Sequence, residues 1–291
     1  MSLYMKKLKL HEVKPKTLGK SQKGQDAYIN HIVENLGTTN KYYVEFGASN
    51  GNDDSNTYFL RTAKNWNGLL LEADSKQFPP NPSINLHNAT LTMENSCEVF
   101  ASHNVPKTFD FLSVDIDGND YWILSKILEN YNPRVIMVET CARFDPDVRM
   151  VQKYDPNFVW QGNRWIGGSP LAFKLLGKKH GYTAVYMHLD DMFLIKDSEL
   201  HSSNLNPLWS TIYPHALPHL YQSHDKSTRE KYLYQVLRKI SEDIGLDGKS
   251  RGLYDSYHQC VLFELAKGIN KELHLDRWWT CNINEDEWMT V

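Results

Sequence analysis

The sequence has little of what marks secreted, membrane-spanning or nucleic-acid-binding proteins. It holds only four cysteines in 291 residues, all scattered and none in a CxxC pair: Cys97, Cys141, Cys260 and Cys281. That spacing argues against a disulfide framework or a zinc site, and favours a reducing, intracellular setting. No apolar run approaches the roughly 18 residues that a membrane span needs. The formal net charge of −3, without a long basic block, gives no electrostatic reason to expect nucleic acid.

The start of the chain is rich in lysine but lacks the continuous apolar core of a signal peptide. We therefore expect a cytoplasmic protein that binds no membrane. The composition, 41% hydrophobic and 23% charged, is ordinary for a globular protein. We predict an N-terminal arm (1–20), a core (21–197) and a helical, aromatic-rich C-terminal extension (198–291) whose helices include residues 233–244 and 257–267. The sequence does not predict an oligomeric state.

Short apolar runs alternate with segments of helical periodicity in the core. Helical spacing of apolar residues predicts helices over 21–37, 56–64, 121–129 and 170–179, the last with Ser169 as N-cap. The strand candidates are 42–46, 68–72, 84–87, 109–114, 134–138, 182–188 and 192–195. Strands alternating with helices predict an α/β fold, a parallel sheet covered on both faces. The last two candidates lie a few residues apart and predict an antiparallel hairpin around Asp190-Asp191.

The stretch YVEFGASNG (43–51) ends the first strand, where a doubly wound sheet binds its ligands. Gly47 lets the backbone turn sharply, and Gly51 lets another group approach closely. The pattern is E-x-G-x-x-x-G, not G-x-G-x-x-G, and no lysine follows to make a P-loop. Glu45 would repel a pyrophosphate. Glu72 ends the second strand about 20 residues after the last glycine, where a ribose diol is held.

These features indicate a nucleoside ligand without a phosphate. S-adenosylmethionine suits them best, because its ammonium matches Glu45 and its carboxylate matches backbone donors in the loop. The plainer interpretation is a structural turn at Gly47 and Gly51 with a solvated Glu72.

A second polar stretch, DIDGND (115–120), follows the strand 109–114. Asp115 and Asp117 lie two residues apart, so on an extended segment they face the same side, and Glu139 ends the expected neighbouring strand. Three hypotheses stay open. The carboxylates act as a general base in methyl transfer, they hold Mg²⁺ or another hard cation, or Asp115-Ile116-Asp117 is the metal motif of a glycosyltransferase. Asp120 is interpreted as the N-cap of the next helix.

Four segments together resemble the FkbM-like class I methyltransferases: SQKGQDAYI (21–29), YVEFGASNG (43–51), DSNTYFLRTAKNWNGLLLEAD (54–74) and FLSVDIDGNDYWIL (111–124). The resemblance covers residues 21 to about 195 and departs at Ala73-Asp74, where many relatives have a proline. It implies a Rossmann-like fold with a seven-stranded sheet, parallel apart from one hairpin strand, and S-adenosylmethionine as cofactor. It also implies O-methylation of a hydroxyl on a sugar or another small molecule.

The resemblance and the residue patterns together give a predicted site. The expected cofactor-binding residues are Glu45, Gly47, Asn50, Gly51, Ser55, Asn56, Thr57, Glu72 and Asn88, the last beside adenine. The expected catalytic residues are Asp115, Asp117 and Glu139, which are also the candidate Mg²⁺ ligands. His188 is an alternative base, and the aromatic segment 154–165 is expected to be a lid or to pack on the C-terminal helices. The rival hypotheses are a metal-dependent glycosyltransferase and a non-catalytic S-adenosylmethionine-binding or scaffold protein.

Overall fold

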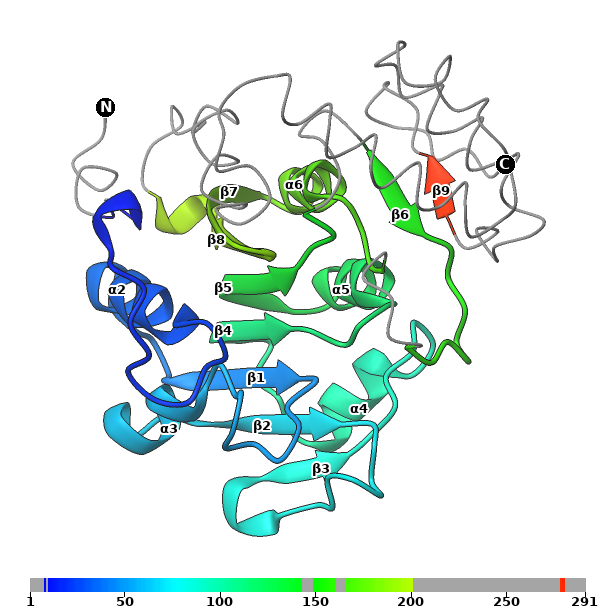
Figure 1. Ribbon diagram of the computed structural model, residues 1–291, viewed down its shortest axis with the longest axis horizontal. Helices are drawn as coiled ribbons and strands as arrows, with labels where there is room; N and C mark the ends of the chain where they lie inside the picture. Colours follow the sequence, from blue (N-terminus) through cyan, green and yellow to red (C-terminus); the bar gives the residue numbers. More distant parts are fainter. Residues whose placement is uncertain (1–7, 9, 143–148, 161–165, 201–277, 281–291) are drawn as a thin grey trace, which may run out of the picture.

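The computed structural model describes residues 8, 10–142, 149–160, 166–200 and 278–280. Its centre is a seven-stranded sheet (Figure 1). The strands are β1 (Tyr42–Phe46), β2 (Asn67–Glu72), β3 (Leu86–Asn88), β4 (Thr108–Val114), β5 (Asn132–Glu139), β7 (Tyr182–His188) and β8 (Asp191–Lys196). The helices are α2 (Gln25–Leu36), α3 (Tyr58–Lys64), α4 (Ser96–Ser102), α5 (Asp120–Leu128) and α6 (Pro170–Lys179), with short 3₁₀ turns η1 (Leu10–Glu12), η2 (Pro82–Ile84) and η3 (Asp197–Glu199).

The strand order is β3-β2-β1-β4-β5-β8-β7. All pairs are parallel except those of β8, which runs antiparallel to both β5 and β7. This order with a single reversed strand next to the edge is that of the Rossmann-like class I methyltransferase fold. The predicted fold class is therefore confirmed, including the antiparallel hairpin.

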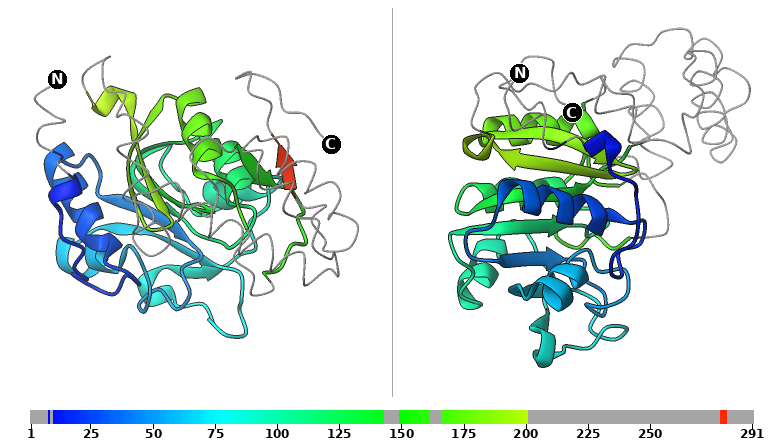
Figure 2. Two further views of the ribbon diagram at one scale, coloured as in Figure 1. Left: turned by 45° about the horizontal axis from the view of Figure 1, so that its top comes forward. Right: turned by 90° about the vertical axis from the view of Figure 1, so that its left-hand side faces the viewer.

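Alternation along the buried strands explains why helices cover both faces. In β1, Val44 and Phe46 face one apolar cluster, which α4, α5 and α6 complete, whereas Tyr43 faces a second cluster under α2 and α3. Figure 2 shows α2 and α3 in front of the sheet when it is viewed from the left of Figure 1. Because both faces are buried, the strands are apolar nearly throughout.

Strand and helix bounds differ from the predictions at the polar ends. The strands at 42–46 and 182–188 coincide with their predictions, but β3 begins at Leu86, because Pro82–Ile84 forms η2 and Asn85 takes a left-handed conformation (φ 56°). Ser169 caps α6 as predicted, since its hydroxyl accepts from the Ala172 N–H at 3.3 Å. The predicted helices at 233–244 and 257–267 lie outside the described residues.

Two further strands pair away from the main sheet. β6 (Met150–Gln152) runs antiparallel to β9 (Trp278–Thr280), so the region predicted as a helical extension contributes a strand within the described residues. Among the helices described, none has the length and apolar character needed to cross a membrane.

Candidate functional site

The loop after β1 turns sharply against the end of β4. Gly47 has φ 76°, and a Cβ there would lie 1.4 Å from the carbonyl oxygen of Asp115. The Ala48 N–H donates to the Leu71 carbonyl at 3.2 Å, and the Asp115 N–H donates to the Phe46 carbonyl at 3.3 Å. The loop is thus fixed between the carboxyl ends of β2 and β4, and the requirement for glycine at position 47 comes from the protein's own backbone.

The second glycine of the loop is also constrained by the protein itself. Gly51 has φ 71°, and a Cβ there would lie 2.8 Å from methyl carbons of Leu70 and Ile84. The close approach that we predicted at Gly51 is therefore made by these two side chains. Asn50 shapes the adjacent turn, because its side-chain oxygen accepts from the N–H groups of Asn52 and Asp53, each at 2.8 Å.

Glu45 lies beneath this loop as a buried carboxylate, 2% exposed. It accepts hydrogen bonds from the Ser55 hydroxyl and the Asn56 N–H, both at 2.7 Å, and from the N–H and hydroxyl of Thr57. Burial raises its pKa, and these donors oppose the rise. The carboxylate thereby fixes the approach to α3. The predicted contact of Glu45 with a ligand ammonium remains a prediction.

The side chain of Asn56, next to Glu45, is only partly hydrogen-bonded. Its side-chain N–H donates to the Ser113 hydroxyl at 3.3 Å, while its side-chain oxygen is buried with no hydrogen-bond partner in the described structure. A buried polar atom without a partner costs roughly 1–3 kcal/mol. A ligand that donates a hydrogen bond at this point would remove that cost.

Glu72 meets the loop from the neighbouring strand, while its predicted contact with a ribose diol remains a prediction. One carboxylate oxygen accepts from the Ser49 N–H at 2.8 Å, and the other accepts from the Asp74 N–H at 2.9 Å. Each carboxylate oxygen has a second lone pair, so a ligand hydroxyl can still donate to Glu72. Asn88 stands beside it in the sheet, and its amide N–H₂ donates to the carbonyls of Glu72 and Phe78 at 3.3 and 2.9 Å. Asn88 thus braces the segment between β2 and β3, while its predicted contact with adenine remains a prediction.

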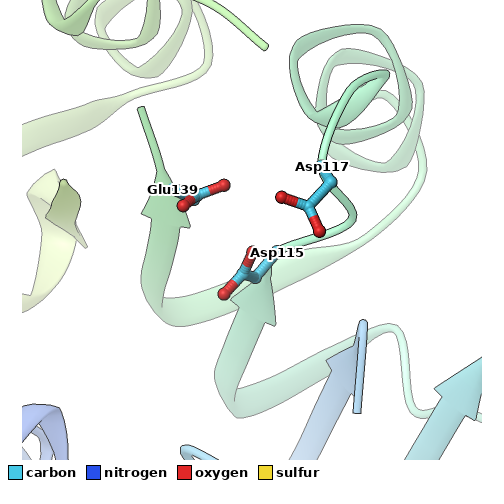
Figure 3. Close-up of side chains that lie close together, drawn as sticks. All are labelled: Asp115, Asp117 and Glu139. Carbon is cyan, nitrogen blue, oxygen red and sulfur yellow. The ribbon is translucent and has the colours of Figure 1, made fainter. Parts of the chain in front are cut away.

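Asp115, Asp117 and Glu139 converge at the carboxyl ends of β4 and β5 (Figure 3). Each offers a carboxylate oxygen, and these oxygens lie within 4.8 Å of one another. The convergence was predicted, but the geometry that produces it differs. Asp117 has φ 55°, so the chain turns after β4, and the extended segment assumed from the two-residue spacing is absent here.

The three carboxyl groups of this acid cluster perturb one another. Burial, with the charges of Asp191, Asp120 and Asp117 in addition, raises the pKa of Asp115 well above its usual range. Burial and the charge of Asp115 do the same to the pKa of Glu139. Burial and the charge of Glu72 raise the pKa of Asp117.

The predicted role of Asp120 was wrong. Asn119 is the N-cap position of α5 and Asp120 its first residue. The Asp120 carboxylate accepts from the N–H groups of Ile116 and Gly118, both at 2.9 Å, because the turn after β4 leaves these donors without strand partners. Burial raises the pKa of Asp120 to about 6. Asp120 therefore holds the turn on which Asp117 sits.

Asp191 is a site residue that the sequence analysis missed. It is the first residue of β8, stands opposite Glu139 in the register, and accepts from the Gln25 side-chain amide at 2.9 Å. Burial raises its pKa to about 6. Like charges directly opposite on paired strands are unfavourable, so this arrangement is unusual. The pair Asp190-Asp191 had been interpreted as a turn. The polar stretch SQKGQD (21–26) was the other sequence signal that could have pointed to Asp191, because it contains Gln25, which donates to Asp191.

The aromatic segment packs on the turn that carries Asp117. A Cβ at Gly118 would lie 2.4 Å from the Phe158 ring, and the Asn119 amide donates to the Asp155 carbonyl at 2.8 Å. The described part, residues 154–160, thus lies beside the acid cluster, and residues 161–165 lie outside the description. His188 packs instead against α2: its ring centroid is 4.6 Å from that of Tyr28, and its Nε2 lies 2.8 Å from the Lys23 carbonyl.

Comparison with known proteins finds distant structural likenesses. An O-methyltransferase from Bacillus cereus in complex with S-adenosylhomocysteine is 14% identical, with 67% of this chain and 92% of that chain covered and a TM-score of 0.41. A S-adenosylmethionine-dependent methyltransferase from Clostridium acetobutylicum is 10% identical, with 65% and 95% covered and a TM-score of 0.37. Magnesium protoporphyrin IX methyltransferase from Synechocystis, with bound S-adenosylhomocysteine, is 8% identical, with 59% and 81% covered and a TM-score of 0.35.

No model of a known protein family matches the chain, and no curated protein matches it. The structural likenesses are too distant to carry an argument about function. The fold therefore rests on the sheet order, and a function has to be argued from the site. The narrower resemblance to FkbM-like enzymes stays a prediction.

Proposed function

We propose that this chain is a S-adenosylmethionine-dependent methyltransferase that methylates a hydroxyl group of a small molecule. The observation that carries the proposal is the meeting of the Glu72 carboxylate with the loop after β1 through the Ser49 N–H. In a sheet of this order, ligands bind at the carboxyl ends of the strands, where a strand-end acid holds a ribose diol. The loop lacks the pattern of a pyrophosphate or P-loop site, which favours a nucleoside without a phosphate.

Two acceptors suit the two ends of this cofactor. The remaining lone pairs of Glu72 would accept from the ribose hydroxyls. The unpaired side-chain oxygen of Asn56 would accept from the α-ammonium, a role that we had given to Glu45. Gly47, Gly51 and Asn50 would shape the loop around the cofactor, Ser55 and Thr57 would hold it through Glu45, and Asn88 would border adenine.

The acid cluster supports proton removal from the methyl acceptor. The cofactor supplies a methyl group that is already activated, so the protein has to position the nucleophile and accept its proton. Asp115 and Glu139 lie together in the cluster with raised pKa values, and a raised pKa makes an ionised carboxylate a stronger base. The ionised carboxylate would take the proton of the acceptor hydroxyl as the hydroxyl oxygen bonds to the methyl carbon and the bond from that carbon to the sulfonium sulfur breaks, which would leave S-adenosylhomocysteine. Asp117 would accept a hydrogen bond from the acceptor.

The same carboxylates fit a hard divalent cation by their chemistry. Mg²⁺ prefers oxygen ligands, and Asp115, Asp117 and Glu139 offer three within 4.8 Å of one another. A bound cation would lower the pKa of the acceptor hydroxyl. A requirement for Mg²⁺ remains a secondary proposal. A sugar as acceptor rests on the FkbM-like resemblance, and carboxylates that accept from hydroxyls are compatible with it. A cytoplasmic location is likewise a prediction.

Calorimetric titration with S-adenosylhomocysteine, with and without Mg²⁺, tests the proposal. The wild-type chain should bind with a Kd in the range of about 1–100 µM, equivalent to about 5.5–8 kcal/mol. Glu72→Gln is the informative variant because it keeps the size of the side chain and one acceptor for the loop, but removes the charge. We expect it to weaken binding about tenfold or more, the cost of one charge-assisted hydrogen bond.

Glu129→Gln is the matched control, since it makes the same chemical change at an exposed position just past α5. It should bind like the wild type. Equal unfolding temperatures for the two variants would show that the loop still folds in Glu72→Gln. The methyltransferase proposal fails if the wild-type chain binds no S-adenosylhomocysteine under either condition. Binding of a nucleotide sugar that depends on Mn²⁺ would then favour the glycosyltransferase hypothesis.

A further inference from the structure

The segment before α2 concentrates positive charge in a chain that is acidic overall. Residues 1–23 contain one acidic residue, Glu12, against seven lysines, a formal charge of +6. The whole chain carries −3, so residues 24–291 carry −9. The seven are Lys6, Lys7, Lys9, Lys14, Lys16, Lys20 and Lys23. Such an asymmetry of charge within one chain indicates a basic segment that meets an anionic partner.

The described part of this segment is folded onto the start of α2 (Figure 1, dark blue). The Leu18 and Gly19 N–H groups donate to the Asp26 carboxylate at 3.0 and 2.7 Å. The Asp26 N–H in turn donates to the Ser21 hydroxyl oxygen at 3.3 Å, and both of these residues are buried. Because its backbone is held by these contacts, the segment presents its outward side chains from fixed positions.

The lysines of the folded part lie on the surface. Four of them are exposed: Lys14, Lys16, Lys20 and Lys23. The first two have no ion-pair partner among the described residues. Lys20 pairs with Asp53 at 2.9 Å, and Lys23 Nζ lies 3.7 Å from an Asp190 carboxylate oxygen. Exposed ion pairs of this kind are weak, so these lysines can also bind another anion.

The composition of the segment favours a lipid bilayer over a nucleic acid. Leu18 lies among the lysines and is one of three large apolar side chains exposed in the described chain. Basic side chains with an apolar one between them suit the boundary between headgroups and acyl chains. The first arginine of the sequence is Arg61, so the segment lacks the planar fork that binds phosphates in pairs of hydrogen bonds. No aromatic residue lies between Tyr4 and Tyr28 on which a base could stack.

We propose that residues 12–23 dock this protein on the surface of a bilayer that contains anionic lipids. Each lysine near such a surface strengthens binding about fivefold. The negative charge of the rest of the chain opposes docking only within about 8–10 Å of the surface, because salt screens charges beyond that distance. The docked surface adjoins the candidate site, since Lys20 contacts Asp53 in the loop after β1.

Peripheral docking of this kind differs from the membrane contact that the sequence argues against. We expected no membrane binding because no apolar run is long enough to span a bilayer. A basic surface with one apolar side chain lies on the bilayer and needs no span. The inference goes beyond the proposed function and does not depend on it.

Cosedimentation of the full chain with lipid vesicles tests the proposal. One set of vesicles is phosphatidylcholine alone, and in the other about a third of the lipid is phosphatidylglycerol. We expect binding to the anionic vesicles to be about tenfold tighter or more, and to weaken as salt is raised. The double variant Lys14→Glu, Lys16→Glu should bind them about twentyfold or more weakly. The double variant Lys14→Arg, Lys16→Arg should bind like the wild type, because it keeps the charge.

Two further variants separate the segment from general effects of charge. Lys126→Glu, Lys179→Glu makes the same change of charge in the last turns of α5 and α6, and should bind vesicles like the wild type. Leu18→Ser should weaken vesicle binding severalfold, since it removes apolar surface without altering the charge.

Absence of binding to the anionic vesicles, or equal binding to both kinds of vesicle, would overturn the proposal. An equal loss in the two Lys→Glu double variants would do the same. Tighter binding to double-stranded DNA than to the anionic vesicles would assign the segment to nucleic acid instead. Titration with S-adenosylhomocysteine tests the proposed function separately, and none of these results changes its outcome.

Discussion

At the scale of single residues, several polar groups of the candidate site lie in buried environments that cost folding free energy. Asn56 has a buried side-chain oxygen with no partner among the described residues, and burial with neighbouring charges raises the pKa values of Asp115 and Glu139. Strongly perturbed carboxyl groups occur at functional sites more often than elsewhere, although structural networks also produce them. Because these groups lie beside the loop after β1 that Glu72 contacts, we assign them to the proposed ligand site.

The clearest prediction at this scale concerns Gly47. Gly47→Ala places a Cβ 1.4 Å from the Asp115 carbonyl oxygen in addition to a left-handed backbone, so the loop and β4 must separate. We expect a loss of about 4 kcal/mol or more in the free energy of unfolding, the range of severe single mutations, measured by urea denaturation. Gly181→Ala is the control, since Gly181 has φ 78° but no atom of the described residues within 4 Å of the added Cβ. It should lose about 1–2 kcal/mol, and equal losses for both variants would contradict the steric argument.

At the scale of secondary-structure elements, a buried ion pair fixes the connection between α2 and β1. Arg134 on β5 donates to Asp110 on β4 at 2.8 Å, and both side chains are at most 8% exposed. Asp110 also accepts from the backbone N–H groups of Thr39, Asn40 and Lys41. Arg134 reaches further, to Glu199 at 2.5 Å. The network ties the end of α2, the segment before β1, the strands β4 and β5, and η3 at the edge opposite the site.

Removal of the charge on Asp110 should therefore lower the free energy of unfolding strongly. Asp110→Asn leaves Arg134 buried beside a neutral group and replaces one acceptor oxygen by a donor that faces backbone N–H groups. We expect a loss of about 3–5 kcal/mol, typical of a broken buried ion pair, measured by urea denaturation. Glu34→Gln, which removes one partner of the exposed pair with Lys64, should lose under about 1 kcal/mol. Similar losses for both variants would mean that the Asp110 network contributes little to the free energy of unfolding.

The elements also show what a sequence can and cannot predict. Strands 42–46 and 182–188 were predicted at their observed bounds, because buried strands are unbroken apolar runs that turn residues delimit. The three-residue strand β6 was not, because it exists only through pairing with β9, far along the chain. Asp191 was missed for a related reason. Its neighbours Glu139 and Gln25 come from β5 and α2, which are distant in the sequence. No local sequence pattern predicts contacts between segments so far apart.

At the scale of the whole molecule, the charge distribution predicts how stability depends on pH. Burial raises the pKa of both Asp120 and Asp191 to about 6, above the ordinary 3.8. A carboxyl group whose pKa is raised by folding binds more protons in the folded state, so stability is gained as pH falls through the folded pKa and lost as pH rises through it. Burial tends to raise the pKa of Asp110, but donors led by Arg134 hold it below 3.8, so its contribution disappears only in stronger acid.

The free energy of unfolding should therefore rise as the pH is lowered from about 7 to 5, by roughly 1 kcal/mol for each of Asp120 and Asp191. Below about pH 4 it should fall, because Asp110 then takes up a proton and its network with Arg134 is lost. Urea denaturation at several pH values measures this profile. Asp191→Asn removes one titrating group and should lower the rise between pH 7 and 5 by roughly 1 kcal/mol. A stability that falls steadily as the pH is lowered from 7 would contradict this prediction, as would a profile that Asp191→Asn leaves unchanged. Either result would mean that ionisation of these carboxyl groups costs the folded protein no free energy.

The base proposed for methyl transfer would then lose its electrostatic support, because the same neighbours raise the pKa values of Asp115 and Glu139.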